Sequence, residues 1–169
     1  MTTSTINYGS DTAITFDVSS LGTSSTFLAG RESTQIDNTS NKFIDAIVTC
    51  DGITGHASTA PVVGQQIHLY LWGSDVSLAT TPIDTLDGTD SAETLAHDSV
   101  RQSLVLVAAP TVTVATAGLK YYIPPFSVVL ALGHMPKFWG LFLSHNHTGA
   151  LAASQSGIWS YYGIKYDSA

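Results

Sequence analysis

The sequence predicts an all-β protein: an antiparallel β-sandwich or jelly roll with one or two short helices. Short runs of alternating or β-branched residues recur along the chain, and turn-forming sequences separate them. Charged residues make up only 11% of the chain, less than half of the roughly 25% that is usual in globular proteins. Ser, Thr, Gly and Ala take their place, which is typical of β-sandwiches whose surfaces are partly covered by partners.

The first 40 residues differ in composition from the rest of the chain. Thr, Ser, Asn and Gly dominate, and AITFDV (13–18) and TFLAG (26–30) are the strand-like runs among them. We expect an N-terminal extended arm with edge strands over 1–40, followed by a β-sandwich (jelly-roll) body over 41–169. With 169 residues the chain is long enough for one domain overall with its own core.

Five further runs predict the strands of the body: 42–50, 65–74, 103–116, 137–145 and 158–166. In the second run, Ile67, Leu69 and Leu71 share one face, while His68, Tyr70 and Trp72 share the other. Pro110 interrupts the third run and predicts a bulge or an edge there. The fourth, KFWGLFLSH, is almost continuously apolar, as expected for a strand buried on both faces.

Two segments predict short helices. DSAETLAHD (90–98) begins with Asp90 and has Glu93 three residues later, which is a capping-box arrangement. PFSVVLALG (125–133) has Pro125 at a suitable first position and Gly133 as a stop.

The charge distribution, the cysteine count and the apolar runs of the sequence argue against several classes of protein. The formal net charge is −7, and the six basic residues are scattered, which argues against direct binding of nucleic acid: Arg31, Lys42, Arg101, Lys120, Lys137 and Lys165. The single cysteine, Cys50, excludes an internal disulfide. The N-terminus does not resemble a signal peptide, and no apolar run approaches the roughly 18 residues that a membrane span needs. We expect a protein made in a cytoplasm that does not contact a membrane.

His145 and His147, in FLSHNHTG, have the spacing that places two side chains on the same face of a strand. A cupin-type metalloenzyme would add a carboxylate a few residues later and a third histidine on a later strand. Here no carboxylate follows until Asp167, whereas a catalytic metal needs about three protein ligands. We therefore expect no metal, and a strand end whose imidazoles are hydrogen-bonded or solvated.

An acidic segment, residues 75–98, contains six of the thirteen acidic residues and no Lys or Arg. Its acids do not follow the calcium-loop pattern, and spacing alone does not identify a carboxylate pair for glycoside hydrolysis. Two interpretations remain: a docking surface for a basic partner, or a solvated connection whose acids cap a short helix.

The motifs of common enzyme classes are missing from the sequence. It contains no G-x-S-x-G, no phosphate-binding loop and no dinucleotide-binding G-x-G-x-x-G. We predict that the protein is not an enzyme, with no catalytic residues and no cofactor. Six aromatic residues on the predicted strands are expected in the core or an interface, with a sugar-stacking face as the alternative: Tyr70, Trp72, Trp139, Trp159, Tyr161 and Tyr162.

Several strings between residues 29 and 166 resemble a family of small proteins encoded in the head-gene clusters of tailed bacteriophages. They are AGREST, IDNTSNKFIDAIVT, LYLWGS, IDTLDGTDSAET, YYIPPFSV, MPKFWGLFLSHNHTGAL and YYGIKY. In SHNHTGAL this chain has His147 where the family pattern suggests a shorter HNTG.

The resemblance implies a virion structural protein, a capsid decoration or cement protein outside the head. It would bind the major capsid protein lattice, stabilise the head and form a homo-oligomer, often a trimer in such proteins. We expect capsid contacts at Arg31 and Glu32 and at Asp84, Asp87 and Asp90 of the acidic segment. The alternative is a phage tail or head-fibre domain that binds host carbohydrate through Tyr70, Trp72 and Trp159.

Overall fold

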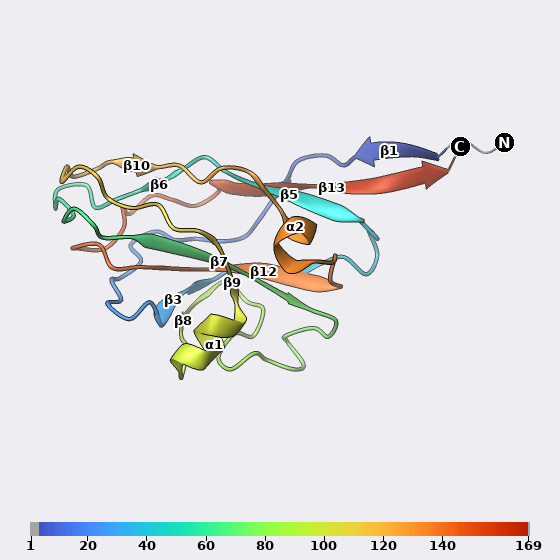
Figure 1. Cartoon of the computed structure of the whole chain (residues 1–169), viewed down its shortest axis with the longest axis horizontal. Helices are drawn as coiled ribbons and strands as arrows, with labels where there is room; N and C mark the ends of the chain where they lie inside the picture. Colours follow the sequence, from blue (N-terminus) through green and yellow to red (C-terminus); the bar gives the residue numbers. More distant parts are fainter. Residues whose placement is uncertain (1–3, 169) are drawn as a thin grey trace.

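Two antiparallel sheets face each other across an apolar core in the computed structural model, which describes residues 4–168 (Figure 1). The predicted all-β sandwich with short helices is confirmed. The first sheet has the strand order β1 (Ser4–Tyr8), β13 (Trp159–Ser168), β5 (Asp45–Cys50) and β11 (Phe126–Ser127), and β2 (Thr12–Ala13) also pairs with β13.

The second sheet carries most of the predicted body strands. Its order is β8 (Ser91–Thr94), β3 (Ala29–Glu32), β12 (Phe138–His145), β7 (Ile67–Ser74) and β9 (Val105–Ala108), and β4 (Ile36–Asp37) also pairs with β12. A separate two-stranded ladder joins β6 (Ile53–Thr54) to β10 (Lys120–Tyr121). β12 is buried along almost its whole length, as its continuous apolar sequence predicts.

The two faces of β7 lie in two different apolar clusters, as the alternation in its sequence predicts. Ile67, Leu69 and Leu71 point into the main core between the sheets. Tyr70 and Trp72 point to the opposite face of the second sheet, where they join a smaller cluster that we call the outer cluster. The second sheet is therefore covered on both faces.

The N-terminal segment is not an extended arm, contrary to the prediction. Ile14, Phe16 and Val18 are buried in the main core because their alternation directs one side of the segment between the two sheets. β3 is an internal strand between β8 and β12, whereas β1, β2 and β4 each pair with one strand and fit the predicted edge position.

One predicted helix is displaced and the other is present. Residues 91–94 form β8 and pair with β3, while α1 (Asp98–Ser103) begins where the predicted helix was expected to end. α2 (Val128–Leu132) lies within 125–133, with the Ser127 side chain accepting a hydrogen bond from the Leu130 backbone N–H. Gly133 ends α2 with φ of 79°, a conformation that glycine adopts without strain.

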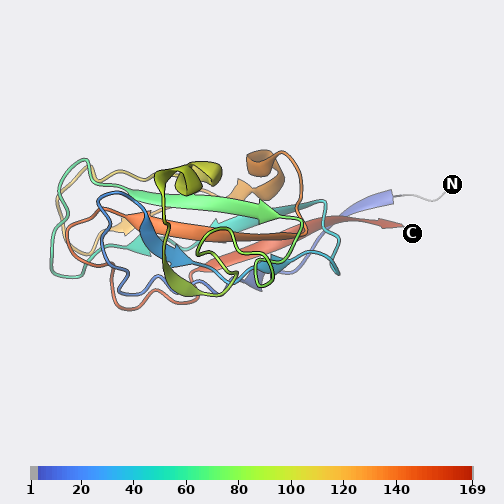
Figure 2. The ribbon, with the colours of Figure 1, turned by 90° about the horizontal axis from the view of Figure 1, so that it is seen from below.

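Part of the first sheet extends beyond the sandwich body. The ribbon of β1 and the end of β13 projects away from the packed sheets, as two perpendicular views show (Figures 1 and 2). Ile6, Tyr8 and Tyr166 on this ribbon are more than half exposed. Within residues 4–168, no helix is long and apolar enough to cross a membrane.

Candidate functional site

His145 is a structural residue with both ring nitrogens engaged. It is fully buried at the end of β12, and its Nδ1 accepts a hydrogen bond from the His147 backbone N–H at 3.2 Å. The Nε2 atom therefore carries the proton and donates to the Leu21 carbonyl at 2.9 Å. This tautomer leaves no free lone pair on His145 for a metal ion.

His147 is also buried, at 2% exposure, and packs against Tyr121 with the ring centroids 4.9 Å apart. The hydrogen-bonded or solvated environment predicted for both imidazoles holds for His145 only, since neither ring nitrogen of His147 bonds to a described residue. Burial, and to a smaller extent the neighbouring His145, lower the pKa of His147 to about 4. Among residues 4–168, no three His, Cys, Asp or Glu side chains are grouped so that they could hold a metal ion.

We expect His147 to make the fold sensitive to acid. Its pKa is about 4 in the folded chain and 6.5 ordinarily. The unfolded chain therefore binds the proton first, and stability is lost as the pH falls from about 6.5 through about 4. The loss reaches about 3 kcal/mol at full protonation. The test is urea unfolding between pH 7 and pH 4 of the wild type and of H147F, whose difference cancels the contributions of other groups. A difference that does not change with pH would contradict this assignment.

The aromatic residues proposed as an alternative sugar-binding face are in the interior. Tyr70, Trp72 and Trp159 are at most 4% exposed. Trp159 packs on Phe16 in the main core, and Tyr70 packs on Phe142 in the outer cluster. These rings cannot stack on a sugar without unfolding, so the expectation of a core position is confirmed for them.

The structure brings together the two regions that the sequence predicted as contact surfaces. Arg31 on β3 donates from Nε to Asp90 Oδ1 at 2.7 Å and from Nη2 to the Asp90 carbonyl at 3.1 Å. Asp90 also accepts from the Asp17 backbone N–H at 3.2 Å. Hydrogen bonding to Asp90 raises the pKa of Arg31, although burial opposes it. The two predicted surfaces thus form one site.

Glu32 lies beneath this site and is fully buried. Its carboxyl oxygens accept hydrogen bonds from the backbone N–H groups of Asp87 at 2.9 Å and Gly88 at 3.0 Å. The expectation that Glu32 touches a partner directly is wrong, because its side chain cannot reach the surface. It is instead a positioning residue that holds the acidic segment.

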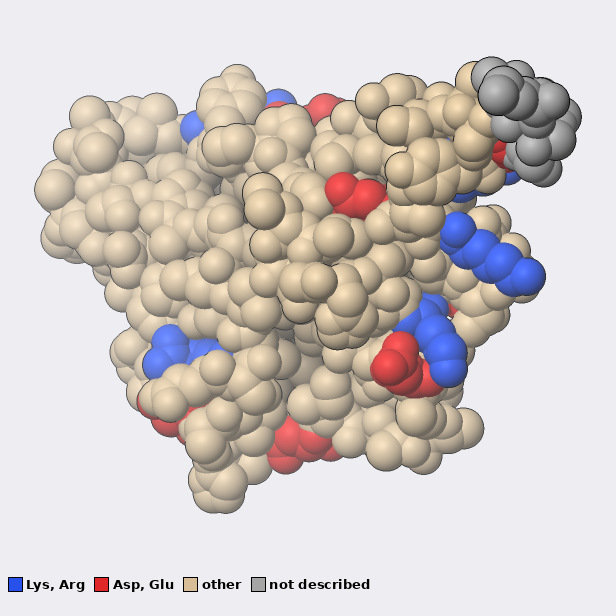
Figure 3. Space-filling view, turned by 45° about the vertical axis from the view of Figure 1, so that its right-hand side comes forward, with Lys and Arg blue, Asp and Glu red and all other residues tan. Residues whose placement is uncertain are grey.

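The remaining acids of the segment are mostly exposed and use part of their oxygens to fix the backbone. Asp84 Oδ2 accepts from the Ala96 N–H at 2.6 Å, and Asp87 Oδ1 accepts from the Thr89 N–H at 2.9 Å. Asp98 pairs with Arg101 on α1, with Nε at 2.8 Å. The result is a fixed surface with four exposed acidic residues: Asp75, Asp84, Asp87 and Asp98. Elsewhere charged side chains are sparse, as one face of the molecule illustrates (Figure 3).

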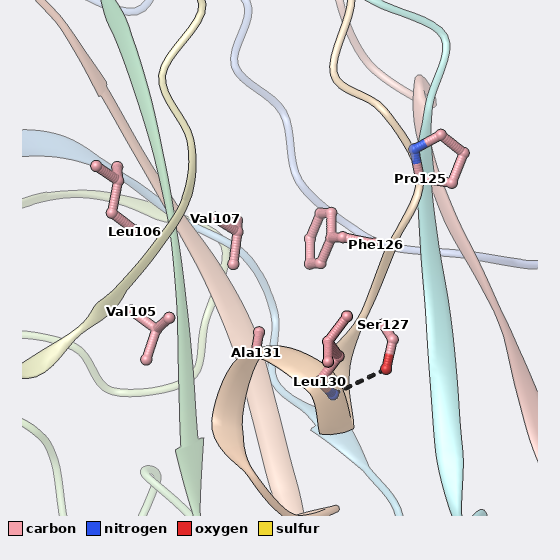
Figure 4. Close-up of a pocket in the computed structure, with 8 residues that line it drawn as sticks. All are labelled: Val105, Leu106, Val107, Pro125, Phe126, Ser127, Leu130 and Ala131. Atoms are coloured by element: carbon pink, nitrogen blue, oxygen red, sulfur yellow. Dashed lines mark hydrogen bonds between the residues drawn. The ribbon is translucent and has the colours of Figure 1, made fainter.

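An apolar groove that the sequence did not reveal lies between β9 and the β11–α2 region (Figure 4). It has a volume of about 320 Å³, and its lining residues are mainly aliphatic: Val105, Leu106, Val107, Pro125, Phe126, Ser127, Leu130 and Ala131. Leu106 and Leu130 at its rim are 48% and 86% exposed. β9 and β11 end their respective sheets, so the groove lies where both sheets have an open edge.

Comparisons with protein-family models, with curated proteins and with solved structures find no match to this chain.

Proposed function

We propose that the chain is a virion structural protein of a tailed bacteriophage: a jelly-roll decoration or cement protein that binds the major capsid protein lattice from outside. The resemblance of the strings between residues 29 and 166 supports this role. The observation that carries the proposal is the acidic segment, which presents exposed carboxylates on a backbone fixed by Arg31 and Glu32. A fixed array of like charges complements a basic patch on a partner.

Exposed apolar groups supply a second kind of contact in this proposal. Ile6, Tyr8 and Tyr166 lie exposed on the projecting β1–β13 ribbon, and the β9–β11 groove is apolar. Such surfaces suit contacts with neighbouring copies in a homo-oligomer, and a trimer is the form that the phage resemblance suggests. Contiguous exposed apolar groups in a protein of low charge favour interfaces over free solvent.

Modest affinity at each contact is sufficient for this role, because the same contact is repeated over the capsid. A shell offers many copies of one binding site, so a linked oligomer gains avidity without new contacts at each site. A protein that binds only the assembled lattice also stabilises that lattice by mass action. The chain is made in the host cytoplasm and acts on the capsid exterior, and the role needs no catalytic residue, cofactor, direct nucleic-acid contact or membrane. The carbohydrate-binding alternative loses its support because Tyr70, Trp72 and Trp159 are buried.

Binding to undecorated capsids tests the proposal. Purified protein mixed with capsids that lack it should co-sediment to a saturating ratio fixed by the lattice. The double variant D84N/D87N keeps oxygen acceptors at both positions but removes two charges, and its affinity should fall about tenfold at low salt and less at high salt. D51N, at an exposed acid outside the segment, is the matched control and should bind normally. Absence of saturable binding by the wild type would overturn the proposal.

A further inference from the structure

The acidic segment covers an apolar face of the second sheet. Leu78, Leu86 and Leu95 of the segment are almost completely buried in the outer cluster. They pack there with Tyr70, Trp72 and Phe142 from β7 and β12. If the segment lifted from the sheet, this cluster would become exposed to solvent, so the contacts that hold the segment decide whether the molecule presents a charged or an apolar face.

Two residues hold the segment to the second sheet: Glu32 on β3 and Gln35, which lies just before β4. Glu32 accepts the backbone N–H groups of Asp87 and Gly88. The Gln35 backbone N–H donates to the Gly88 carbonyl at 2.9 Å, and the Gln35 Oε1 atom accepts from the Leu78 N–H at 3.1 Å. Gly88 has φ of 82°, which allows its N–H to point at the Glu32 carboxyl group.

The charged groups around Glu32 disfavour its ionised form. Burial raises the pKa of Glu32 most, to about 8; the two N–H bonds oppose this rise, and repulsion from Asp87 of the segment and Glu93 of β8 adds to it. β12 places the apolar Phe142 opposite Glu32. Among the described residues, no Lys, Arg or His pairs with Glu32.

The two arginines of the chain are engaged elsewhere. Arg31, the neighbour of Glu32 on β3, pairs with Asp90. Arg101 on α1 pairs with Asp98 and donates to the Tyr70 hydroxyl at 3.1 Å. Neither guanidinium group is therefore available to neutralise Glu32 without breaking a contact of its own.

We propose that the Glu32 carboxyl group is a proton-dependent lock on the acidic segment, closed when protonated and released when ionised. A buried carboxylate without a cation gains hydration only if the segment lifts, and lifting also separates it from Asp87. Because the pKa of Glu32 lies above its ordinary value of 4.5, the contribution of the lock is complete below about pH 4.5 and is lost as the pH rises through about 8. The lock is a property of the isolated chain and does not depend on a role at the capsid.

Hydrogen exchange at single amides tests the lock. After correction for the intrinsic pH dependence of exchange, protection of the Asp87 and Gly88 amides should fall about a hundredfold between about pH 6 and about pH 9. Amides in the centre of β12 serve as the internal reference and should keep their protection. Protection at Asp87 and Gly88 that stays constant or increases with pH would overturn the proposal.

Two variants separate ionisation from packing. E32Q removes the ionisable group, so its protection at Asp87 and Gly88 should be independent of pH and close to that of the protonated wild type, because an amide and a carboxylic acid both accept mainly through the carbonyl oxygen. E93Q removes a neighbouring charge and retains Glu32, so the pH response should persist. If E32Q responded to pH as the wild type does, the lock would be assigned to the wrong group.

Discussion

Alanine at Gly30 is expected to destabilise the fold by about 3 kcal/mol or more, a large part of the roughly 5–15 kcal/mol available to a typical domain. Gly30 lies in β3, between β8 and β12. A Cβ atom there would overlap the Leu143 carbonyl oxygen and lie 2.6 Å from Phe142 Cζ. The Leu143 oxygen belongs to the backbone of the most buried strand, so relief requires separating β3 from β12.

Urea unfolding of G30A measures this effect, and G22A is its matched control. Apart from the two residues next to it in the chain, no described residue has a heavy atom within 4 Å of a Cβ at Gly22. G22A should therefore unfold within about 0.5 kcal/mol of the wild type. If the urea midpoints of G30A and the wild type were equal, β3 and β12 could not lie as close together as the approach of Gly30 to the Leu143 carbonyl oxygen requires.

Removing the Trp139 side chain is expected to cost about 3–5 kcal/mol. Trp139 is fully buried in the main core and packs edge-on against Tyr161 across the two sheets, with ring centroids 5.3 Å apart. Its indole N–H bonds to no described residue. W139F should therefore cost much less than W139A, because it keeps an aromatic ring and removes an unpaired polar group.

The control for Trp139 is L130A, at a residue that is 86% exposed. It should change the free energy of unfolding by less than about 0.5 kcal/mol. Chemical denaturation of the three variants beside the wild type gives the comparison. A small loss for W139A would mean that this ring does not join the two sheets, and would revive the interpretation of these aromatics as a binding face.

Local periodicity was sufficient to predict the strands whose faces differ in polarity or are wholly apolar. The alternation in 65–74 predicted the two faces of β7, and the continuous apolar run 137–145 predicted the burial of β12. The capping-box pattern at Asp90 and Glu93 predicted a helix that does not form at residues 91–94. Pairing of these residues with β3 outweighs their local preference for helix. The composition of the first 40 residues concealed the alternation of Ile14, Phe16 and Val18, which marks them as core.

The candidate site could be predicted only in part, because its contacts join distant residues. Composition identified the acidic segment, and Arg31 and Asp90 were both named as contact residues. Their ion pair spans 59 positions and the Glu32–Gly88 bond spans 56, and no local pattern indicates such a pair. Burial of Glu32 depends on the segment folding back over the second sheet, where its three leucines pack against β7 and β12, and this is also a tertiary effect.

We propose that this β-sandwich acts by covering and joining other proteins on a phage head. Electron cryomicroscopy of the intact particle tests it most directly. We predict density matching the two-sheet body at lattice-related positions outside the capsid shell, with the acidic segment against the shell. Finding the chain only in the tail, or missing from the particle, would contradict the claim.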